Sequence, residues 1–529
     1  MKYVAGVVAV AGSLLLAGFP AGVVAADRDS ARSRTDQMII QFSDDNSRHI
    51  QSVQRNQAVP DLRLPDGRRV KFLRRLEDKA IVVQLPDEIS LDDARRMAAQ
   101  LAAQPGIASA QPDKRFYPAL VPNDTEYLPG QNAIQDPGQW HLFEDTAGIN
   151  MPPAWDQSTG SATTVVAVVD TGIVMHRDLD AGRILAGYDF ISDPFAANDG
   201  DGRDNDPTDP GDWADPGDPC FKNDPIEDRS SWHGMSVSSV IMATSDNNTD
   251  IAGIDFAARL LPVRVLGKCG GSLSDVADAV RWAAGLPVSG VPNNSNPADV
   301  INLSLSGDGA CSTFEQDAIN AAVGAGAVVV VAAGNEGGNV QNISPANCNN
   351  VITVGAIARD GKIAAYANVG PNVDLVAPGG DDPVPADPVN NPPNGILTLS
   401  NFGTTTAGAD ALATIQGTSF TAAQVSAVAA LMLSVDATLS PATVQDVLKA
   451  TTRAFPDISC DTSQCGTGVL DAGAALAGAA DPTAVLGKAA NSGGGGGCSL
   501  SAGRPALDPL FVLMLALAGL LPVYRRLKN

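Results

Sequence analysis

The central part of the chain alternates short apolar runs with longer alanine-rich stretches. The runs occupy residues 164–169, 260–266, 300–305, 327–332, 351–356 and 373–376. They are continuously apolar rather than alternating, which is typical of parallel strands buried on both faces. Helices are expected at residues 275–284, 314–324, 421–435 and 441–449. The pattern predicts an α/β fold: a doubly wound, mostly parallel sheet with helices on both faces and a site at the carboxyl ends of its strands.

Residues 36–118 predict a separate, small α+β domain. Strand-like segments at 38–40, 70–73 and 80–83 precede an Ala- and Arg-rich helix at 91–104, which ends at Pro105-Gly106. A last strand over residues 107–116 would complete a four-stranded sheet.

The two ends of the chain carry targeting patterns. Residues 1–26 have a basic start, an apolar run and small residues at the end, which predicts a cleaved signal peptide. Residues 491–529 hold five consecutive glycines, an apolar stretch over 507–523 and a basic end at Arg525-Arg526. That stretch is adequate for a tilted membrane span with its basic end in the cytoplasm. We therefore expect an exported protein, secreted or at the cell surface, with transient or stable C-terminal membrane attachment.

Charge and cysteine content narrow the class of protein. The net charge of −24 argues against nucleic acid as a partner. The charge is concentrated in residues 119–487, which hold 44 Asp and Glu against 13 Lys and Arg. Export places the seven cysteines in an oxidising compartment, and the six central ones allow fifteen sets of pairings. Proximity in sequence predicts Cys220–Cys269, Cys311–Cys348 and Cys460–Cys465, with Cys498 left over.

An acidic segment precedes the second half of the sheet. Its carboxylates are Asp199, Asp201, Asp204, Asp206 and Asp209, on a stretch rich in Gly and Pro. Such side chains repel one another unless a hard cation gathers them, and Ca²⁺ takes six to eight oxygen ligands. Two interpretations stay open: a structural calcium site and a solvated acidic loop.

Three short strings carry residues for nucleophilic chemistry. Asp170 ends an apolar run, and His233 and Ser419 each open a predicted helix. A serine hydroxyl attacks only when an imidazole takes its proton, and a carboxylate must fix the tautomer of that imidazole. His176, six residues after Asp170, is the competing histidine. We expect it on a loop that leads away from the strand end.

A fourth string follows another apolar run, as Ala332-Ala333-Gly334-Asn335-Glu336-Gly337. The negative charge that develops on a substrate carbonyl oxygen needs fixed hydrogen-bond donors. The Asn335 amide and the backbone N–H of Ser419 would supply two. The alternative for Gly334-Asn335 is an ordinary turn after a strand.

Together these strings resemble the subtilisin-like serine proteases over residues 135–480. Asp170-Thr171-Gly172 matches the aspartate motif of that family, His233-Gly234 the histidine motif, Gly334-Asn335 the oxyanion motif and Gly417-Thr418-Ser419 the serine motif, in the order of the family. The resemblance implies a serine endopeptidase that acts on extended polypeptides, with Asp170, His233 and Ser419 as triad. It also implies bound Ca²⁺, which favours the calcium interpretation of the acidic segment.

The resemblance assigns roles to other parts of the chain. Residues 300–305 match the substrate-binding strand, and the pocket would be lined by Ser304, Leu305, Ser306, Ala332, Ala333 and Gly334. Small side chains there leave room for a large apolar side chain of the substrate, whereas Glu336 pointing inward would favour a basic one. Residues 36–118 resemble the propeptide, removed by cleavage near residues 118–121. Residues 491–529 resemble tails removed by rhomboid-type sorting proteases, with a plain membrane anchor as the alternative.

The chain departs from the family after His233-Gly234 and after Ser419. Ser236 and Gln424 stand where the family usually has histidines, and we expect these two side chains to lie within reach of each other on facing helices. The departures keep two further interpretations open. One is an inactive scaffold that retains the fold for binding, and the other is a surface-anchored interaction protein that uses its tail.

Overall fold

The computed structural model describes residues 34–43, 63–64, 66–77, 80–114, 120–130, 138–381 and 394–492. The predicted signal peptide, the glycine linker, Cys498 and the apolar tail lie outside the described residues. So do residues 115–119, which include part of the predicted cleavage region.

The N-terminal domain has the predicted four-stranded sheet. Its elements are β1 (Arg34–Phe42), β2 (Lys71–Glu77), β3 (Ala80–Ser90), α3 (Leu91–Ala102) and β4 (Ile107–Pro112), with sheet order β2-β3-β1-β4 and antiparallel pairing throughout. Helix α3 starts where the Ser90 side chain accepts a hydrogen bond from the backbone of Asp93. Apolar side chains of β1, β3 and α3 form its core, among them Met38, Val83 and Leu101.

A seven-stranded parallel sheet forms the centre of the larger domain. Its strands are β5 (Val165–Asp170), β6 (Tyr188–Asp189), β7 (Arg259–Arg264), β8 (Val300–Leu303), β10 (Val328–Ala332), β12 (Ile352–Ile357) and β13 (Leu375–Pro378), in the order β13-β12-β10-β8-β5-β7-β6. The six predicted runs all form strands, and β6 is an addition. The predicted doubly wound α/β fold is confirmed.

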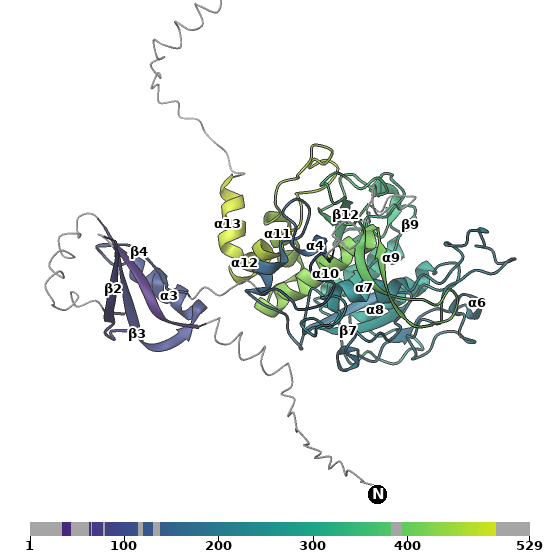
Figure 1. The fold of residues 1–529 in the computed structure, drawn as a ribbon, viewed down its shortest axis with the longest axis horizontal. Coiled ribbons are helices and arrows are strands. Elements are labelled where there is room, and N and C mark those ends of the chain that lie inside the picture. Colours follow the sequence, from purple (N-terminus) through teal and green to yellow (C-terminus); the bar gives the residue numbers. More distant parts are fainter. Residues whose placement is uncertain are drawn as a thin grey trace, which may run out of the picture. The chain divides into compact units, whose positions relative to one another are not determined.

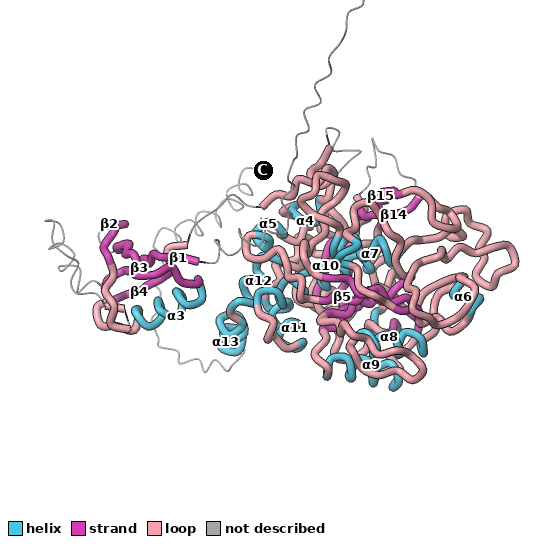
Figure 2. The backbone as a smooth tube through the Cα atoms, turned by 90° about the horizontal axis from the view of Figure 1, so that it is seen from below, coloured by secondary structure: helices cyan, strands magenta, loops and turns pink. Residues whose placement is uncertain are grey.

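Helices cover both faces of this sheet. Helices α7 (His233–Met242) and α10 (Thr418–Val435) lie on one side of β5, and α8 (Leu273–Ala283) and α9 (Thr313–Gly324) lie on the other (Figures 1 and 2). Helix α10 is long and apolar enough to cross a membrane, but 83% of it is buried inside the protein. It packs against β8, β10 and β12 and is the central helix of the core.

Other elements surround the sheet. The shorter helices are α4 (Trp140–Phe143), α5 (Met151–Trp155), α6 (Pro194–Ala197), the 3-10 turns η3 (Ala181–Arg183) and η4 (Val340–Asn342), and the C-terminal α11 (Pro441–Ala450), α12 (Ala472–Ala480) and α13 (Pro482–Ser492). Two small antiparallel pairs were not predicted: β9 (Gly307–Asp308) with β11 (Ile343–Ser344), and the hairpin of β14 (Ile396–Asn401) and β15 (Asp410–Ile415).

The three predicted disulfides are confirmed. The Cα atoms of Cys220 and Cys269 are 5.3 Å apart, those of Cys311 and Cys348 5.2 Å, and those of Cys460 and Cys465 5.6 Å. These separations are normal for disulfides. The bridges close loops around the sheet, as expected of a protein folded in an oxidising compartment.

Candidate active site

Asp170 is the last residue of β5, where the strand reaches the carboxyl edge of the sheet. Its side chain is fully buried. Oδ1 accepts a hydrogen bond of 2.7 Å from the backbone N–H of Thr171 and lies 2.8 Å from Nδ1 of His233. A buried carboxylate that accepts from Nδ1 fixes the imidazole tautomer and leaves Nε2 free to accept a proton.

His233 is the first residue of α7, and its side chain is 26% exposed. Burial by itself lowers the pKa of His233, but the charge and hydrogen bond of Asp170 raise it above its usual value, with smaller contributions from Asp212 and Asp209. The ring of His233 lies 6.0 Å from the ring of Phe420, centroid to centroid. The start of α10 is therefore beside this histidine.

The contact between β5 and α7 is close because Gly234 has no side chain. Its backbone N–H donates to Thr171 Oγ1 at 2.9 Å, and a Cβ at this position would lie 2.3 Å from the carbonyl oxygen of Gly172. Thr171 Oγ1 in turn donates to Asp209 Oδ2 at 2.7 Å. The two backbone segments that carry Asp170 and His233 are thus joined directly.

The residue before His233 is held by a distant hairpin. Trp232 has φ 52°, in the left-handed region, and its side chain is buried. Its ring N–H donates to Gly403 O at 2.7 Å, and the backbone N–H of Ser230 donates to Thr404 O at 2.9 Å. The tip of the β14–β15 hairpin therefore supports the start of α7.

Ser419 is the second residue of α10 and is 8% exposed. Its hydroxyl donates to Ser304 O at 3.3 Å, while Ser304 Oγ donates to Ser419 O at 2.8 Å. The predicted substrate-binding segment and the predicted nucleophile are therefore in contact. In the structure the hydroxyl proton thus points at Ser304, and it would have to turn away before any transfer to His233.

Asn335 follows β10 and is exposed. Its Oδ1 accepts from both the backbone N–H and the Oγ1 of Thr418, each at 2.9 Å. The side chain of Asn335 is therefore bound to Thr418, the residue that directly precedes Ser419 in α10.

The predicted pocket wall runs from Ala332 to Gly334. Gly334 has φ 94°, and its backbone N–H donates to Thr418 Oγ1 at 3.1 Å. A Cβ on Gly334 would lie 2.7 Å from Oε2 of Glu336. The Glu336 carboxylate thus lies beside Gly334, where it accepts a hydrogen bond from Asn368 Nδ2.

His176 lies apart from this group and is 4% exposed. Its Nε2 is 3.2 Å from Ala411 O, and its Nδ1 accepts from the backbone N–H of Asp178 at 3.2 Å. Burial lowers the pKa of His176, so the ring is neutral and serves as a structural link to β15.

The acidic segment is not gathered into one ligand set. Within the described ranges, the group with metal-ligand spacing is Cys311, Glu315 and Cys348, and both cysteines are in a disulfide. Asp199 instead pairs with the fully buried Arg264 at 2.9 Å, and Arg264 also pairs with Asp189. Asp204 accepts from Asp206 N, and Asp206 accepts from Thr208 N, so both close local turns. Asp199 also accepts from Asp201 N, and Asp209 accepts from Thr171 Oγ1.

Two buried carboxylates, those of Asp124 and Asp178, lie near each other in another part of the domain. Asp124 is 5% exposed, and its Oδ1 is a buried oxygen without a hydrogen-bond partner. Asp178 is fully buried and accepts from Asn247 Nδ2 at 2.7 Å. Burial, with smaller contributions from the charges of Asp250 and Asp124, raises the pKa of Asp178 to about 7 although the hydrogen bonds from Asn247 and Ile251 lower it. The unpartnered Oδ1 of Asp124 is a carboxylate oxygen, which is the kind of ligand that Ca²⁺ takes.

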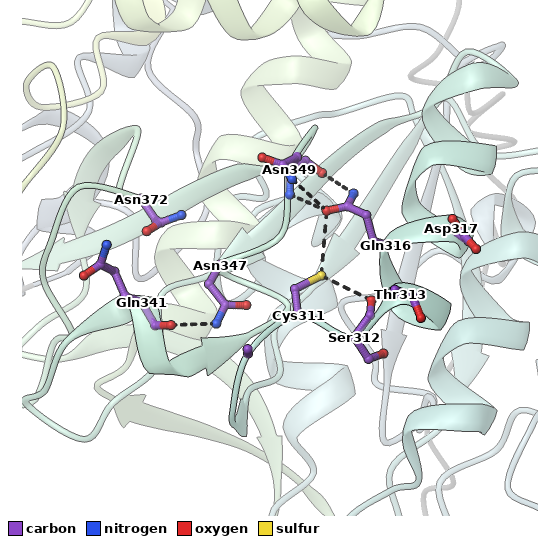
Figure 3. Close-up of a pocket in the computed structure, with 10 residues that line it drawn as sticks. Cys311, Ser312, Thr313, Gln316, Asp317, Gln341, Asn347, Asn349 and Asn372 are labelled. Atoms are coloured by element: carbon purple, nitrogen blue, oxygen red, sulfur yellow. Dashed lines mark hydrogen bonds between the residues drawn. The ribbon is translucent and has the colours of Figure 1, made fainter.

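A polar cavity of about 520 Å³ lies elsewhere, at the start of α9. Carboxamides dominate its lining, which Figure 3 shows to include Gln316, Gln341, Asn347, Asn349 and Asn372. Its lining includes none of the predicted triad, oxyanion or pocket residues.

The expected Ser236–Gln424 contact is replaced by two separate ones. Both residues are fully buried, on helices that pack together. Ser236 Oγ donates to Leu399 O at 2.9 Å, whereas Gln424 Nε2 donates to Pro378 O at 2.7 Å. Gln424 Oε1 has no hydrogen-bond partner. Each side chain therefore pairs with a main-chain carbonyl, so the two substitutions are not one coupled change.

Asp170 and His233 are in contact, Asn335 is bound to the start of α10 just before Ser419, and the Phe420 ring of the same helix lies 6.0 Å from that of His233. These contacts stand at the carboxyl ends of strands in a doubly wound α/β fold. The model of the subtilase family matches residues 161–484, and the chain belongs to that family.

Three proteins that are similar to this chain are proteases by name. The chain is 45% identical over 405 residues to an extracellular protease of Xanthomonas campestris pv. campestris, covering 76% of this chain and 65% of that protein. It is 38% identical over 416 residues to an extracellular basic protease of Dichelobacter nodosus, covering 78% and 64%. The chain thus spans just under two thirds of the length of these relatives. A solved structure of a protease from Pseudoalteromonas arctica matches with TM-score 0.62 and 46% identity, covering 68% of this chain and all of that one.

Proposed function

We propose that this protein is a secreted serine endopeptidase that hydrolyses peptide bonds in extended polypeptides through an acyl-enzyme on Ser419. His233 Nε2 takes the hydroxyl proton as Ser419 Oγ attacks the scissile carbonyl carbon, and Asp170 stabilises the resulting imidazolium. Asn335 Nδ2 and the Ser419 backbone N–H hold the carbonyl oxygen as it becomes negative. His233 then gives the proton to the leaving amine as the C–N bond breaks. A water molecule then attacks the acyl-enzyme in the same way, with His233 as its base, and the carboxylic acid product is released from Ser419.

The observation that carries this proposal is the 2.8 Å contact between His233 Nδ1 and Asp170 Oδ1, beside the start of the helix that carries Ser419. A histidine placed for structure alone would not need a buried carboxylate and an adjacent helix N-terminal serine.

Removal of any triad side chain tests the proposal. Ser419→Ala, His233→Ala and Asp170→Ala should each abolish casein hydrolysis and autoprocessing. His176→Ala is the matched control and should keep both, because that ring serves structure. A purified wild-type protein without peptidase activity would support the inactive scaffold instead.

We propose that the pocket prefers a basic side chain before the cut bond. Of the two alternatives that the sequence leaves open, the Glu336 carboxylate over Gly334 favours this one. A panel of chromogenic peptides with Lys, Arg, Phe or Leu before the cleaved bond separates them. Glu336→Gln should reduce the preference for Lys and Arg, and equal rates for all four peptides would contradict it.

We propose that the enzyme is made as a zymogen whose propeptide is residues 36–118. Its support is the compact antiparallel sheet over β1 to β4, which precedes the family domain in the chain. Cleavage is expected near residues 118–121, by the enzyme itself.

The tail over residues 491–529 is proposed as a substrate of a rhomboid-type sorting protease, with a retained anchor as the alternative. A mass spectrum of the secreted form tests both termini.

We propose that Ca²⁺ stabilises the fold and that Asp124 and Asp178 are among its ligands. The buried, unpartnered Oδ1 of Asp124 supports this. When bound, the ion would supply charge compensation for carboxylates, and it takes no part in the peptidase steps.

A further inference from the structure

Asn368 lies between β12 and β13 and is 1% exposed. Its side chain makes three hydrogen bonds, all to one segment: Nδ2 donates to Ala333 O at 3.0 Å and to Glu336 Oε2 at 2.5 Å, and Oδ1 accepts from Gly338 N at 2.7 Å. Its backbone N–H donates to Gly334 O at 3.1 Å. All these polar groups of one buried residue are therefore used to hold residues 333–338.

This segment has little rigidity of its own. It contains Gly334 at φ 94°, Gly337 at φ 63° and Gly338, and residues 335–339 are exposed. Glycine leaves the backbone many accessible conformations, which must be restricted by contacts from outside. Gly337 N also donates to Tyr366 O at 2.6 Å, so two points of the 366–368 stretch hold it.

The packing of Asn368 on Gly334 leaves no space between them. A Cβ on Gly334 would lie 2.4 Å from Asn368 Nδ2. The next residue after Gly334 is Asn335, whose side-chain Oδ1 is held by the backbone N–H of Thr418. Asn368 therefore determines where the backbone of Asn335 starts, and Thr418 determines which way its amide turns.

We propose that Asn368 is a positioning residue that sets both the oxyanion donor Asn335 and the pocket carboxylate of Glu336. The bond from Nδ2 to Glu336 has a carboxyl oxygen as its acceptor, and such bonds are among the stronger ones in proteins. The inference rests on the proposed function, because it assigns roles relative to the Ser419 chemistry. It predicts that one buried amide couples reaction rate and side-chain preference.

A double-mutant cycle tests the link to Asn335. Loss of one oxyanion donor typically lowers kcat by roughly 10²–10³-fold, which is expected for Asn335→Ala. Asn368→Ala should lower kcat by about tenfold with little change in KM, as expected when a donor used only in the transition state is misplaced. The double variant should be no slower than Asn335→Ala within about twofold, because residues acting through one group are not additive. A double variant slower by the full product of both factors would overturn the proposal.

Side-chain preference gives the second readout. The ratio of kcat/KM for Lys over Phe peptides should fall about fivefold or more in Asn368→Ala, because Glu336 loses its donor. Asn372→Ala, four residues further along the same stretch, is the matched control and should leave kcat and the ratio unchanged. An unchanged ratio in Asn368→Ala would overturn the link to Glu336.

A second variant keeps the test independent of folding. Asn368→Asp has the same shape and still accepts from Gly338 N, but it loses the donors to Ala333 O and Glu336. It should show the same loss of kcat and of the Lys preference, and wild-type values would overturn the proposal.

Titration of the wild type with a serine-directed phosphonofluoridate separates failure of the proposed function from failure of the inference on Asn368. Absence of labelling at Ser419 contradicts the proposed function, whereas normal labelling with unaffected Asn368 variants contradicts only this inference.

Discussion

Gly234→Ala should disable the enzyme while leaving it folded. The added Cβ would lie 2.3 Å from Gly172 O, and ordinary contacts begin at 3.4 Å, so the two backbones must separate by about 1.1 Å, the difference of these values. The shift acts on the first turn of α7 and moves His233 away from Asp170. A displacement of about 1 Å in a catalytic group costs roughly 10²-fold in rate. That corresponds to about 2.7 kcal/mol of transition-state stabilisation.

The effect on folding should be smaller. Overpacking costs typically about 1–3 kcal/mol, and an alanine in a helix recovers up to about 1 kcal/mol relative to glycine. We would measure kcat on a chromogenic peptide, and thermal unfolding in the Ser419→Ala background, where autolysis is absent. Gly324→Ala in α9 is the control, because a Cβ there meets no atom within 4 Å. Full kcat in Gly234→Ala would refute the argument that this close backbone contact positions His233.

Three further predictions concern charge. Arg264→Met should lower the free energy of unfolding by about 3–5 kcal/mol, measured by urea unfolding in the Ser419→Ala background, because it leaves the fully buried Asp189 unpaired. A loss below about 1 kcal/mol would contradict this. The acid limb of kcat/KM should have its midpoint above 6.5, since the general base must be neutral and the pKa of His233 is raised; a lower midpoint would contradict the assigned charges. Without Ca²⁺, stability should fall as pH rises from 5 to 8, because the pKa of Asp178 is raised to about 7 and the buried side chain becomes charged. Added Ca²⁺ should therefore raise Tm more at pH 8 than at pH 5, and equal shifts would argue against this site.

The sequence predicted the sheet and the candidate triad because both are encoded locally. A continuous apolar run such as 328–332 has few alternatives to a buried strand, and Asp170 stands at the end of another run. Parallel strands place their carboxyl ends at one edge, so residues far apart in sequence were expected to meet there.

The residues that support the site escaped prediction because their partners are distant. Arg264 ends an apolar run and resembles an ordinary strand residue, yet its buried charge binds the acidic segment about 65 residues away. Nothing in the local sequence links Asp199 to an arginine on a strand that far along the chain. Asn368 is one more asparagine in a loop, and its importance comes from bonds to a segment 30 to 35 residues earlier. Local sequence patterns therefore do not predict which buried polar residues of distant loops bind one another.

The β14–β15 hairpin has a consequence for how this protein tolerates change over evolution. Surface turns usually accept insertions and deletions freely. Here the exposed turn around Gly403 and Thr404 supports Trp232, and Asn401 Oδ1 closes it by accepting from Gly403 N at 2.9 Å and Gly408 N at 2.6 Å. A change of one residue in its length would move the residue that precedes His233. Selection should therefore hold the length of this turn constant while the outward-facing side chains, such as that of Phe402, drift.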